Sequence, residues 1–220
     1  MTPIFITGIG TDVGKTVVAA IVTEALQAAY WKPIQAGFKE GTDSQWVAER
    51  ISHPHERIQP ETYRLSLPAS PHISARQEGV RIDLDQIVRH YQQISAPVPD
   101  FLIIEGAGGL LVPLNEQEFV LDLIKRLDAI VILVSRNYLG SINHSLLTAS
   151  VCKAHGLRMA GWIFNDQYLH YEEEIVKWSG LPSFGSIPHY DSPDTEFIRQ
   201  QAKRIRPALI AALNNPLPSH

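Results

Sequence analysis

The chain has 220 residues, of which 45% are hydrophobic and 19% charged, and its formal net charge is −4. This composition is typical of a globular protein with a substantial core, and the small negative charge gives no electrostatic reason to expect nucleic acid or an anionic membrane as a partner. Cys152 is the only cysteine, which excludes an intramolecular disulfide. No apolar run reaches membrane-spanning length and no signal peptide precedes the first apolar run, so we expect a cytoplasmic protein.

The first element is an apolar run, Ile4-Phe-Ile6, that passes into a glycine-rich turn before Gly14-Lys15-Thr16. Backbone N–H groups of such a turn, together with a helix N-terminus, bind anions. Lys15 can then reach the outer phosphates of a nucleotide, and the Thr16 hydroxyl can hold Mg²⁺. The spacing departs from the pattern G-x-x-x-x-G-K-[ST], because Ile9 stands where the first glycine belongs. A chance G-K-T in a loop is disfavoured by the strand before it and the helix after it, and we interpret the stretch as a nucleotide site.

The remaining elements alternate between helices and short apolar strands. We predict helices over residues 15–29, 44–51, 84–94, 119–127, 141–155, 172–178 and 195–213, and strands over residues 30–34, 101–104, 129–134, 159–164 and 184–187. Much of residues 35–99 has a weak pattern and several prolines, and is expected to be irregular. Continuous apolar strands between helices indicate a parallel sheet covered on both faces. The sequence therefore predicts a P-loop NTPase-like α/β fold, with residues 1–220 forming a single domain.

In a parallel sheet, ligands collect at the carboxyl ends of the strands. Glu105 follows the apolar run 101–104 and suits a Mg²⁺ contact, direct or through water. A solvated acid is the alternative, but the following Gly-Ala-Gly-Gly109 favours close approach of a ligand. Lys32, in the predicted second strand, either points to solvent or gives a second cation for phosphate charge. Asp43 is either a third oxygen ligand of the cation or a helix N-cap.

Two later turns carry polar groups that could also bind a ligand. The turn Leu139-Gly-Ser-Ile-Asn-His144 could hold a carboxylate or a phosphate at its free N–H groups, or could be an ordinary turn with Ser141 as a cap. Asn165 and Asp166 follow another strand, where an amide side chain suits a purine edge, although capping is an equally simple role. A metal pair at His53-Pro-His55 is less favoured than a solvated loop.

With these residues assembled, the chain closely resembles the dethiobiotin synthetase family, ATP-dependent enzymes that close the ureido ring in the penultimate step of biotin biosynthesis. The resemblance runs nearly end to end. Its most specific stretches are Thr7–Thr16, Lys32-Pro-Ile-Gln-Ala-Gly37 and Glu105-Gly-Ala-Gly-Gly109. Weaker support comes from Ser70-Pro-His72, Leu139–His144, Gly161-Trp-Ile-Phe-Asn-Asp166 and Ile187-Pro188.

The resemblance implies a role for each candidate residue. Lys15 and Lys32 are expected to be catalytic, and Thr16, Asp43 and Glu105 to hold Mg²⁺. The residues expected to bind ATP are Asp12, Val13, Gly14, Lys15, Thr16, Val17, Asp43, Glu105, Gly106, Ala107, Gly108, Asn165, Asp166, Pro188, His189 and Tyr190. Asn165 and the backbone of 188–190 would receive adenine. The family is a homodimer with its substrate at the subunit interface, where Ala36 and, from the other subunit, Gly140, Ser141 and Asn143 would contact the substrate.

The implied reaction is the carboxylation and ring closure of 7,8-diaminopelargonic acid (7,8-diaminononanoate). CO₂ adds to one amine, ATP phosphorylates the resulting carbamate, and the neighbouring amine attacks the mixed anhydride to release phosphate. Phosphoryl transfer needs positioning and charge stabilisation more than a covalent nucleophile. Two lysines, a metal ion and a phosphate loop therefore suffice, with no nucleic acid or membrane partner.

Two features depart from the family pattern. Ala36 stands where members usually carry Ser or Thr, so the task of that hydroxyl passes to Gln35, to backbone or to water. The region after Asp166 is short, and either Tyr168, Tyr171 or neither matches the tyrosine that the family brings to the substrate carboxylate.

Three other classes of protein fit these residues less well. A partitioning-type switching ATPase, the main alternative, carries a signature lysine where this chain has Gly10. A cobyrinic-acid-type amidase needs a glutaminase domain with a nucleophilic cysteine, for which the chain has no room. A GTPase needs Asn-Lys-x-Asp after a strand, and the segment from Asn165 to Tyr168 does not fit.

Overall fold

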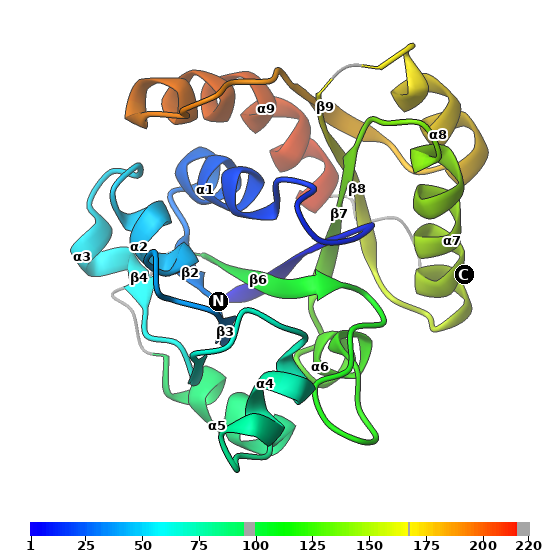
Figure 1. The fold of residues 1–220 in the computed structure, drawn as a ribbon. Coiled ribbons are helices and arrows are strands. Elements are labelled where there is room, and N and C mark those ends of the chain that lie inside the picture. The colour runs from blue at the N-terminus through cyan, green and yellow to red at the C-terminus, as the bar shows by residue number, and fades with distance from the viewer. Residues whose placement is uncertain (95–99, 167, 215–220) are drawn as a thin grey trace.

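A seven-stranded parallel sheet runs through the computed structural model of the chain, which describes residues 1–94, 100–166 and 168–214 (Figure 1). The strand order is β4-β2-β6-β1-β7-β8-β9, and β3 and β5 form a separate parallel pair. The strands of the large sheet are β1 (Thr2–Gly8), β2 (Ala29–Trp31), β4 (Ile58–Gln59), β6 (Phe101–Gly109), β7 (Ile130–Arg136), β8 (Met159–Asn165) and β9 (Ser183–Ile187). The pair comprises β3 (Ile34–Ala36) and β5 (Tyr63–Leu65).

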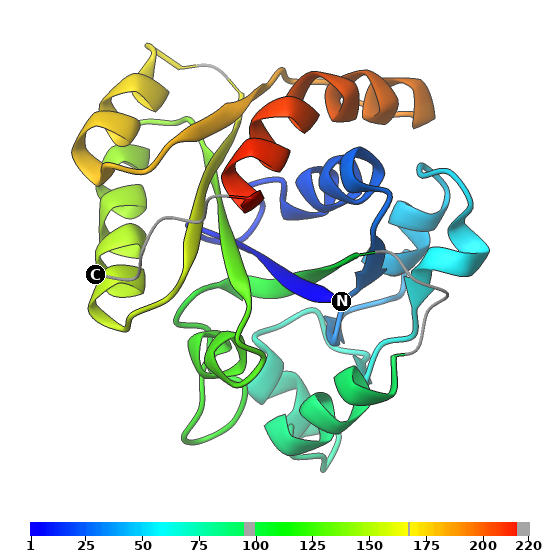
Figure 2. The same cartoon turned by 180° about the vertical axis from the view of Figure 1, so that it is seen from behind.

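Helices cover both faces of the large sheet, as the front and back views show (Figures 1 and 2). One face packs against α1 (Lys15–Leu26), α2 (Asp43–Ala48) and α9 (Thr195–Asn214). The opposite face packs against α4 (Pro71–Gln77), α5 (Leu84–Gln93), α6 (Val120–Arg126), α7 (Ser141–Ala154) and α8 (Tyr171–Ser179). The short helix α3 (Pro54–Arg57) precedes β4. The predicted parallel sheet with helices on both faces is confirmed.

Alternation along the strands explains why both faces are apolar. In β1, Ile4 and Ile6 belong to the core under α1 and α9, whereas Phe5 belongs to the core under α5 and α6. Successive side chains of a strand point to opposite faces, so a strand buried on both sides needs a continuous apolar run. Glu105 shares the parity of Ile103, which lies in the α1 core. Its carboxylate therefore points to the side where α1 begins.

The predicted strand 30–34 was wrong in one respect, because the structure divides it between β2 and β3. Lys32 and Pro33 lie in the break, and the Pro33 carbonyl accepts hydrogen bonds from the backbone N–H groups of Thr62 and Tyr63. Proline has no N–H for a central ladder, so the chain leaves the large sheet at this point. Lys32 consequently stands at the carboxyl end of β2 and not within a strand.

The strand β6 is longer than predicted, whereas the predicted strand 30–34 is divided. Its expected end at residue 104 is too early, because pairing with β1 continues through Ile6 with Glu105 and Gly8 with Gly109. The expected loop in residues 35–99 also contains α3, α4, β4 and β5, which are too short for a clear periodicity. The part of that loop at 95–99 lies outside the described residues.

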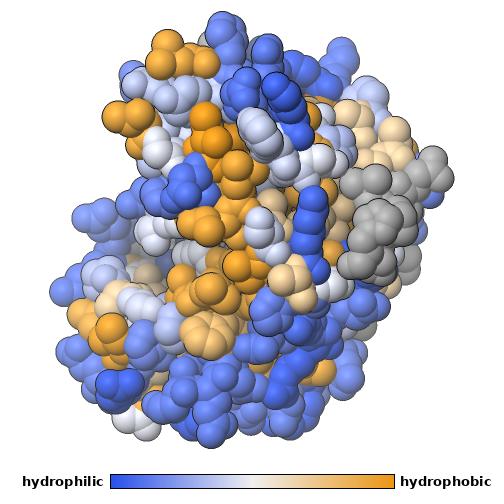
Figure 3. All heavy atoms as spheres, turned by 90° about the vertical axis from the view of Figure 1, so that its right-hand side faces the viewer, coloured by the Kyte–Doolittle hydropathy of each residue, from blue (hydrophilic) through white to orange (hydrophobic). Residues whose placement is uncertain are grey.

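In the described part of the chain, no helix combines the length and the apolarity that crossing a membrane requires. The side of the molecule formed by α7 and α8 nevertheless carries apolar atoms that gather in a hollow (Figure 3). Exposed apolar residues of these two helices and of the turn before α7 are Leu139, Leu147 and Trp178. This side therefore carries exposed apolar side chains among its polar ones.

Candidate active site

The phosphate loop connects β1 to α1 and is tightly packed. A Cβ at Gly8 would come within 2.5 Å of Val13, and one at Gly14, whose φ is +85°, would collide with the Asn165 amide. These glycines are therefore required for close packing and for a left-handed turn. Ile9, which replaces the glycine of the consensus pattern, packs against both cores. The departure from the pattern thus adds an apolar anchor to the loop.

Two pockets lie on either side of this loop and share Asp12, Gly14, Val17 and Pro193. The larger has a volume of about 970 Å³, and the smaller one of about 170 Å³. The larger is lined, among others, by Thr11, Lys15, Thr16, Lys32, Gln35, Ala36, Asp43, Ser70, Glu105, Ala107 and Gly108. The smaller is lined, among others, by Val13, Arg136, Asn165, Asp166, Ile187, Pro188, His189, Tyr190 and Phe197. The shared residues make the two pockets one continuous site across the phosphate loop.

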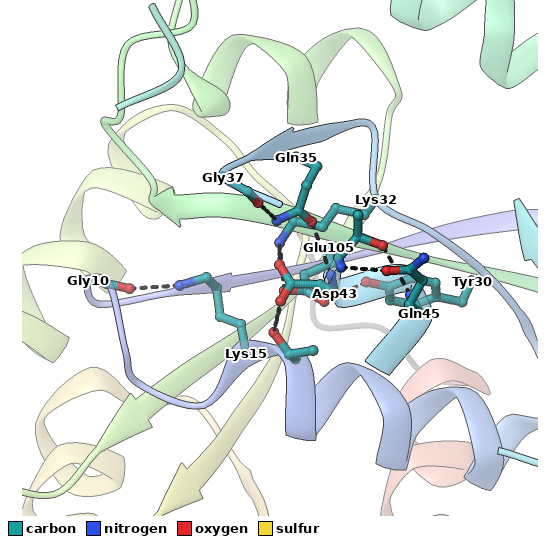
Figure 4. A network of polar contacts seen from close by, with 11 residues as sticks. Gly10, Lys15, Tyr30, Lys32, Gln35, Gly37, Asp43, Gln45 and Glu105 are labelled. Carbon is teal, nitrogen blue, oxygen red and sulfur yellow. Dashed lines mark hydrogen bonds and ion pairs between the residues drawn. The ribbon is translucent and has the colours of Figure 1, made fainter. Parts of the chain in front are cut away.

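The larger pocket contains a cluster of two carboxylates, a hydroxyl and an ammonium (Figure 4). The Lys32 Nζ lies 2.9 Å from Glu105 Oε1 and forms a second ion pair with Asp43 Oδ2. The Thr16 Oγ1 lies 2.9 Å from the same Glu105 oxygen and 3.3 Å from Asp43 Oδ1. Three separate segments, the end of β2, the start of α2 and β6, thus meet the first turn of α1.

Lys32 is 5% exposed and Glu105 is 1% exposed, so this ion pair is buried. Burial by itself would lower the pKa of Lys32, but the charges of Glu105 and Asp43 outweigh that effect and the pKa is raised. Lys32 is therefore an ammonium under all ordinary conditions. The sequence left solvent and an anion as alternatives for this side chain, and the structure pairs it with two carboxylates.

Lys15 has a different environment. Its Nζ donates to the Gly10 carbonyl at 2.8 Å, and no carboxylate lies within ion-pair distance of it among the described residues. Burial lowers the pKa of Lys15, an effect that the charge of Glu105 opposes and that of Lys32 strengthens. An anion placed in the pocket would give this ammonium the partner that the chain itself does not provide.

The start of α2 decides between the two roles considered for Asp43. Thr42 is the N-cap, and its Oγ1 accepts from the Gln45 N–H at 3.1 Å in a complete capping box. The carboxylate of Asp43 is therefore free of capping and faces Lys32 and Thr16. The Gln35 amide holds this corner, accepting from the Asp43 N–H at 3.1 Å and donating to the Gly37 carbonyl at 2.8 Å.

The smaller pocket is built at the carboxyl ends of β8 and β9. Asn165 Nδ2 donates to the Val13 carbonyl at 2.6 Å and fixes the phosphate loop to β8. Arg136 Nε donates to one carboxylate oxygen of Asp166 at 2.6 Å, and the other oxygen lies 3.1 Å from His189 Nδ1. The ring of Tyr190 stacks on Phe197 with centroids 4.7 Å apart. The pocket thus offers an apolar side and a polar edge.

The structure brings most of the predicted residues to these pockets but not all of them. Gly140, Ser141 and Asn143 line neither pocket of this chain, and the same holds for Tyr168 and Tyr171. Of the two alternatives for this turn, the one with Ser141 as the cap is not observed: Gly140 is the N-cap of α7, and Ser141 Oγ accepts from the Tyr138 N–H at 3.3 Å.

Sequence reasoning missed several contributors to the site, among them Tyr30, Arg136 and Phe197. Tyr30 is fully buried and its hydroxyl donates to Glu105 Oε2 at 2.7 Å. The apolar sequence of its strand gives no sign of this hydrogen bond. Arg136 and Phe197 line the smaller pocket from β7 and α9. The rule that ligands collect at strand ends pointed to Arg136, but nothing local pointed to Phe197.

The donor set at the start of α1 fits a small hard cation. Two carboxylates and one hydroxyl are oxygen ligands of the kind that Mg²⁺ prefers, and the lysine ammonium between the carboxylates shows that they accept positive charge. No group of three or more His, Cys, Asp or Glu side chains in the described ranges could hold a metal. Mg²⁺ bound here would therefore need phosphate oxygens and water as its further ligands, as is usual for nucleotide sites.

Comparison with known proteins agrees with this geometry. Residues 2–196 match a family model described as an AAA domain. The ATP-dependent dethiobiotin synthetase of Cytophaga hutchinsonii is 51% identical over 172 residues, which cover 78% of this chain and 81% of that protein. The synthetase of Christiangramia forsetii is 43% identical over 206 residues, covering 93% and 96%. The MinC:MinD cell division complex of Aquifex aeolicus shares the fold, with a TM-score of 0.58, 15% identity and coverage of 99% and 98%.

Proposed function

This chain belongs to the family of ATP-dependent dethiobiotin synthetases, and on that premise we propose how its site performs the carboxylation and ring closure of 7,8-diaminopelargonic acid. One amine of the substrate adds to CO₂ and gives a carbamate. A carbamate oxygen attacks the γ-phosphorus of ATP and ADP leaves. The second amine attacks the carbonyl carbon of the mixed anhydride, phosphate leaves, and dethiobiotin with its cyclic urea remains.

The observation that carries this proposal is the pairing of two lysines with a phosphate loop in one large pocket. Lys15 and Lys32 line the same cavity of about 970 Å³, which has room for the outer phosphates and a second organic substrate. Negative charge develops on the carbamate and on the transferred phosphoryl group. Two ammonium groups in one pocket, one of them fixed by its carboxylate partners, stabilise that charge.

The different surroundings of the two lysines lead us to propose a different role for each. Lys32 is held by Glu105 and Asp43 and keeps a fixed place at the pocket wall, which suits orientation of the carbamate. Among the described residues, the Gly10 carbonyl is the only hydrogen-bond or ion-pair partner of the Lys15 ammonium, which can turn to the γ-phosphoryl group at little cost. The proposed catalytic residues are thus one anchored cation and one mobile cation.

Thr16, Asp43 and Glu105 are the residues we propose to hold Mg²⁺. Bound there with ATP, the ion would neutralise part of the charge on the phosphate oxygens. The support is the convergence of a hydroxyl and two carboxylates at the start of α1.

Replacing Glu105 by glutamine is expected to raise the Mg²⁺ concentration for half-maximal turnover by about tenfold or more, because a buried anionic ligand becomes neutral. The check is a Mg²⁺ titration of the initial rate at saturating ATP. Glu116→Gln, an exposed acid outside the pocket, is the control and should leave the titration unchanged. An unaltered curve for Glu105→Gln would remove this residue from the metal site.

We propose that the smaller pocket holds the adenosine part of ATP, with the phosphate loop from Asp12 to Val17 on the phosphates. The amide nitrogen of Asn165 is committed to the Val13 carbonyl, so its oxygen is the atom that can accept from the adenine amino group. Tyr190, stacked on Phe197, gives an aromatic face beside that edge. Ala107 and Gly108 of β6 line the larger pocket and complete the proposed nucleotide-binding set, together with Gly106, which precedes them in β6 but lines neither pocket.

We also propose that the active form is a homodimer in which each pocket is completed by the other subunit. Gly140, Ser141 and Asn143 are expected to bind the substrate carboxylate, yet they line neither pocket of their own chain. They begin α7, whose exposed Leu147, with Leu139 just before it, gives an apolar surface next to them. Ala36 lines the larger pocket, and we propose that it contacts the substrate there.

Mixing two inactive variants tests the shared site. In an equimolar mixture of Lys32→Ala and Asn143→Ala chains, half of the dimers combine one chain of each kind, and one of their two sites is wholly native. Turnover is expected to recover to about a quarter of that of the native protein, as two-fold symmetry requires. The measurement is the rate after co-refolding, with each variant alone as control. If turnover does not recover, residues 140–143 either belong to the site of their own chain or take no part in a site.

The product assay tests the function itself. Protein is incubated with 7,8-diaminopelargonic acid, bicarbonate, ATP and Mg²⁺, and the product is followed by mass spectrometry. Cyclic urea should form one-for-one with released phosphate, and only when the diamine is present. Phosphate release that ignores the diamine would favour a switching ATPase instead, for which likeness in fold is the present argument.

Two broader proposals accompany this function. We propose that residues 1–220 act as one ATP-binding synthetase domain, since a single sheet supplies the walls of both pockets. We propose the cytoplasm as its location, which is supported by a single buried cysteine whose thiol pKa is raised by burial to about 12 and which is therefore unreactive.

A further inference from the structure

Tyr30 lies beneath the carboxylate cluster and is not part of the pocket lining. It is fully buried in β2, pairs in register with Ile103 of β6, and points to the same face as Glu105 two residues further along that strand. Its hydroxyl donates to Glu105 Oε2 at 2.7 Å, and this is its only hydrogen bond within the described ranges. Figure 4 shows Tyr30 behind the cluster, on the side away from Lys15.

The two oxygens of Glu105 consequently have separate partners. Oε1 meets the groups of the pocket, Thr16 and Lys32, each at 2.9 Å. Oε2 is bound to Tyr30 in the core and is turned away from them. Each carboxylate oxygen has two lone pairs, so a cation that takes both oxygens would have to share Oε2 with the Tyr30 hydroxyl, whereas Oε1 already faces the pocket.

The number of oxygens offered distinguishes two common cations. Mg²⁺ demands near-ideal octahedral geometry and takes one oxygen from each carboxylate, whereas Ca²⁺ accepts more ligands and often both oxygens of one carboxylate. Loss of a buried partner that fixes a ligating carboxylate commonly weakens metal binding by about 10–100-fold.

We propose that Tyr30 is a positioning residue that holds Glu105 as a one-oxygen ligand and thereby makes the cation site prefer Mg²⁺ over Ca²⁺. The inference rests on the proposed metal site at Thr16, Asp43 and Glu105. Packing alone does not require the hydroxyl, because β2 is apolar and fully buried at this point, where phenylalanine would fill the same space.

The test is the binding of Mg²⁺ and of Ca²⁺ to the full chain with saturating ADP, measured by calorimetry. In Tyr30→Phe the dissociation constant for Mg²⁺ should rise by about tenfold, while that for Ca²⁺ changes less, so the preference for Mg²⁺ falls. Tyr63→Phe is the matched control, since Tyr63 is also buried and donates to Gln86 away from the pocket. It should leave both constants unchanged.

A double-mutant cycle separates positioning from a general loss of structure. In a Glu105→Gln background, Tyr30→Phe should add less than about twofold, because the effect acts through Glu105. An unchanged Mg²⁺ to Ca²⁺ ratio in Tyr30→Phe would overturn the inference. Unchanged constants in Glu105→Gln would overturn the metal site and the inference together. Should Tyr30→Phe be unstable, the same titration in trimethylamine N-oxide, which favours the folded state, gives the answer.

Discussion

Replacing Lys32 by methionine is expected to lower kcat by at least about a thousandfold, the size of effect seen when a fixed positive group is removed from a phosphoryl-transfer site. Methionine keeps the length and apolar stem of the side chain but removes its charge. The carbamate then loses the anchored ammonium proposed to orient it and to offset its charge. The measurement is single-turnover formation of the cyclic urea, which separates chemistry from product release.

The same change is expected to destabilise the protein. Lys32 and Glu105 form a buried ion pair, and removal of one partner leaves an uncompensated charge in the core. Such losses cost about 3 kcal/mol or more in the free energy of unfolding. Native proteins have about 5–15 kcal/mol to lose, so most molecules stay folded. The burial of both partners is the reason to expect this loss.

The pH dependence of this loss follows from the direction of the pKa shift. The pKa of Lys32 is raised above its ordinary value of 10.5 in the folded state by Glu105 and Asp43, against the effect of burial. Its contribution to stability is therefore complete below pH 10.5 and is lost only as the pH rises through the folded value. Urea unfolding of both proteins should show a constant difference between pH 7 and 9.

A matched control is Lys153→Met, which removes a lysine that donates to the Ser179 carbonyl at 2.7 Å, far from the site in sequence and outside both pockets. It should lose little stability and no activity. Native-like turnover by Lys32→Met would show that this ammonium does not act on the reacting groups.

The sequence predicted the sheet and the phosphate loop because short local sequence patterns determine both. Continuous apolar runs gave β1, β7 and β8 close to their observed bounds, and Gly14-Lys15-Thr16 gave the start of α1. The strand ends then pointed to Glu105 and Asn165 as candidate site residues, whereas Lys32 was a candidate placed within a predicted strand.

What the sequence could not predict depends on contacts between distant segments. The break at Pro33 and the pairing of β3 with β5 arise where the chain leaves the large sheet, and neither short strand has a period of its own. Tyr30 reads as an ordinary strand residue, yet its hydroxyl meets a carboxylate 75 residues later. The same applies to Phe197, which α9 brings from the end of the chain to the smaller pocket.

Replacing Lys15 by methionine is expected to abolish turnover to a similar extent, about a thousandfold or more, but with the opposite effect on stability. Lys15 is buried without a carboxylate partner, and burial lowers its pKa below 10.5 in the folded state. Folding therefore opposes the charged form, and this cost is fully present below the folded pKa and is relieved as the pH rises from there toward 10.5. Methionine removes the cost, so the variant should unfold at an equal or higher urea concentration.

The two lysine variants are expected to change the stability of the protein in opposite directions. As the pH rises toward 10.5 the cost of burying Lys15 is relieved, so any gain in stability of Lys15→Met over the native protein should shrink. Urea unfolding at pH 7 and pH 9.5 measures this, and single-turnover rates at pH 7 measure the loss of chemistry. A variant that is both inactive and less stable would mean that Lys15 supports the loop through Gly10. A stable, inactive variant would assign its ammonium to the transferred phosphoryl group.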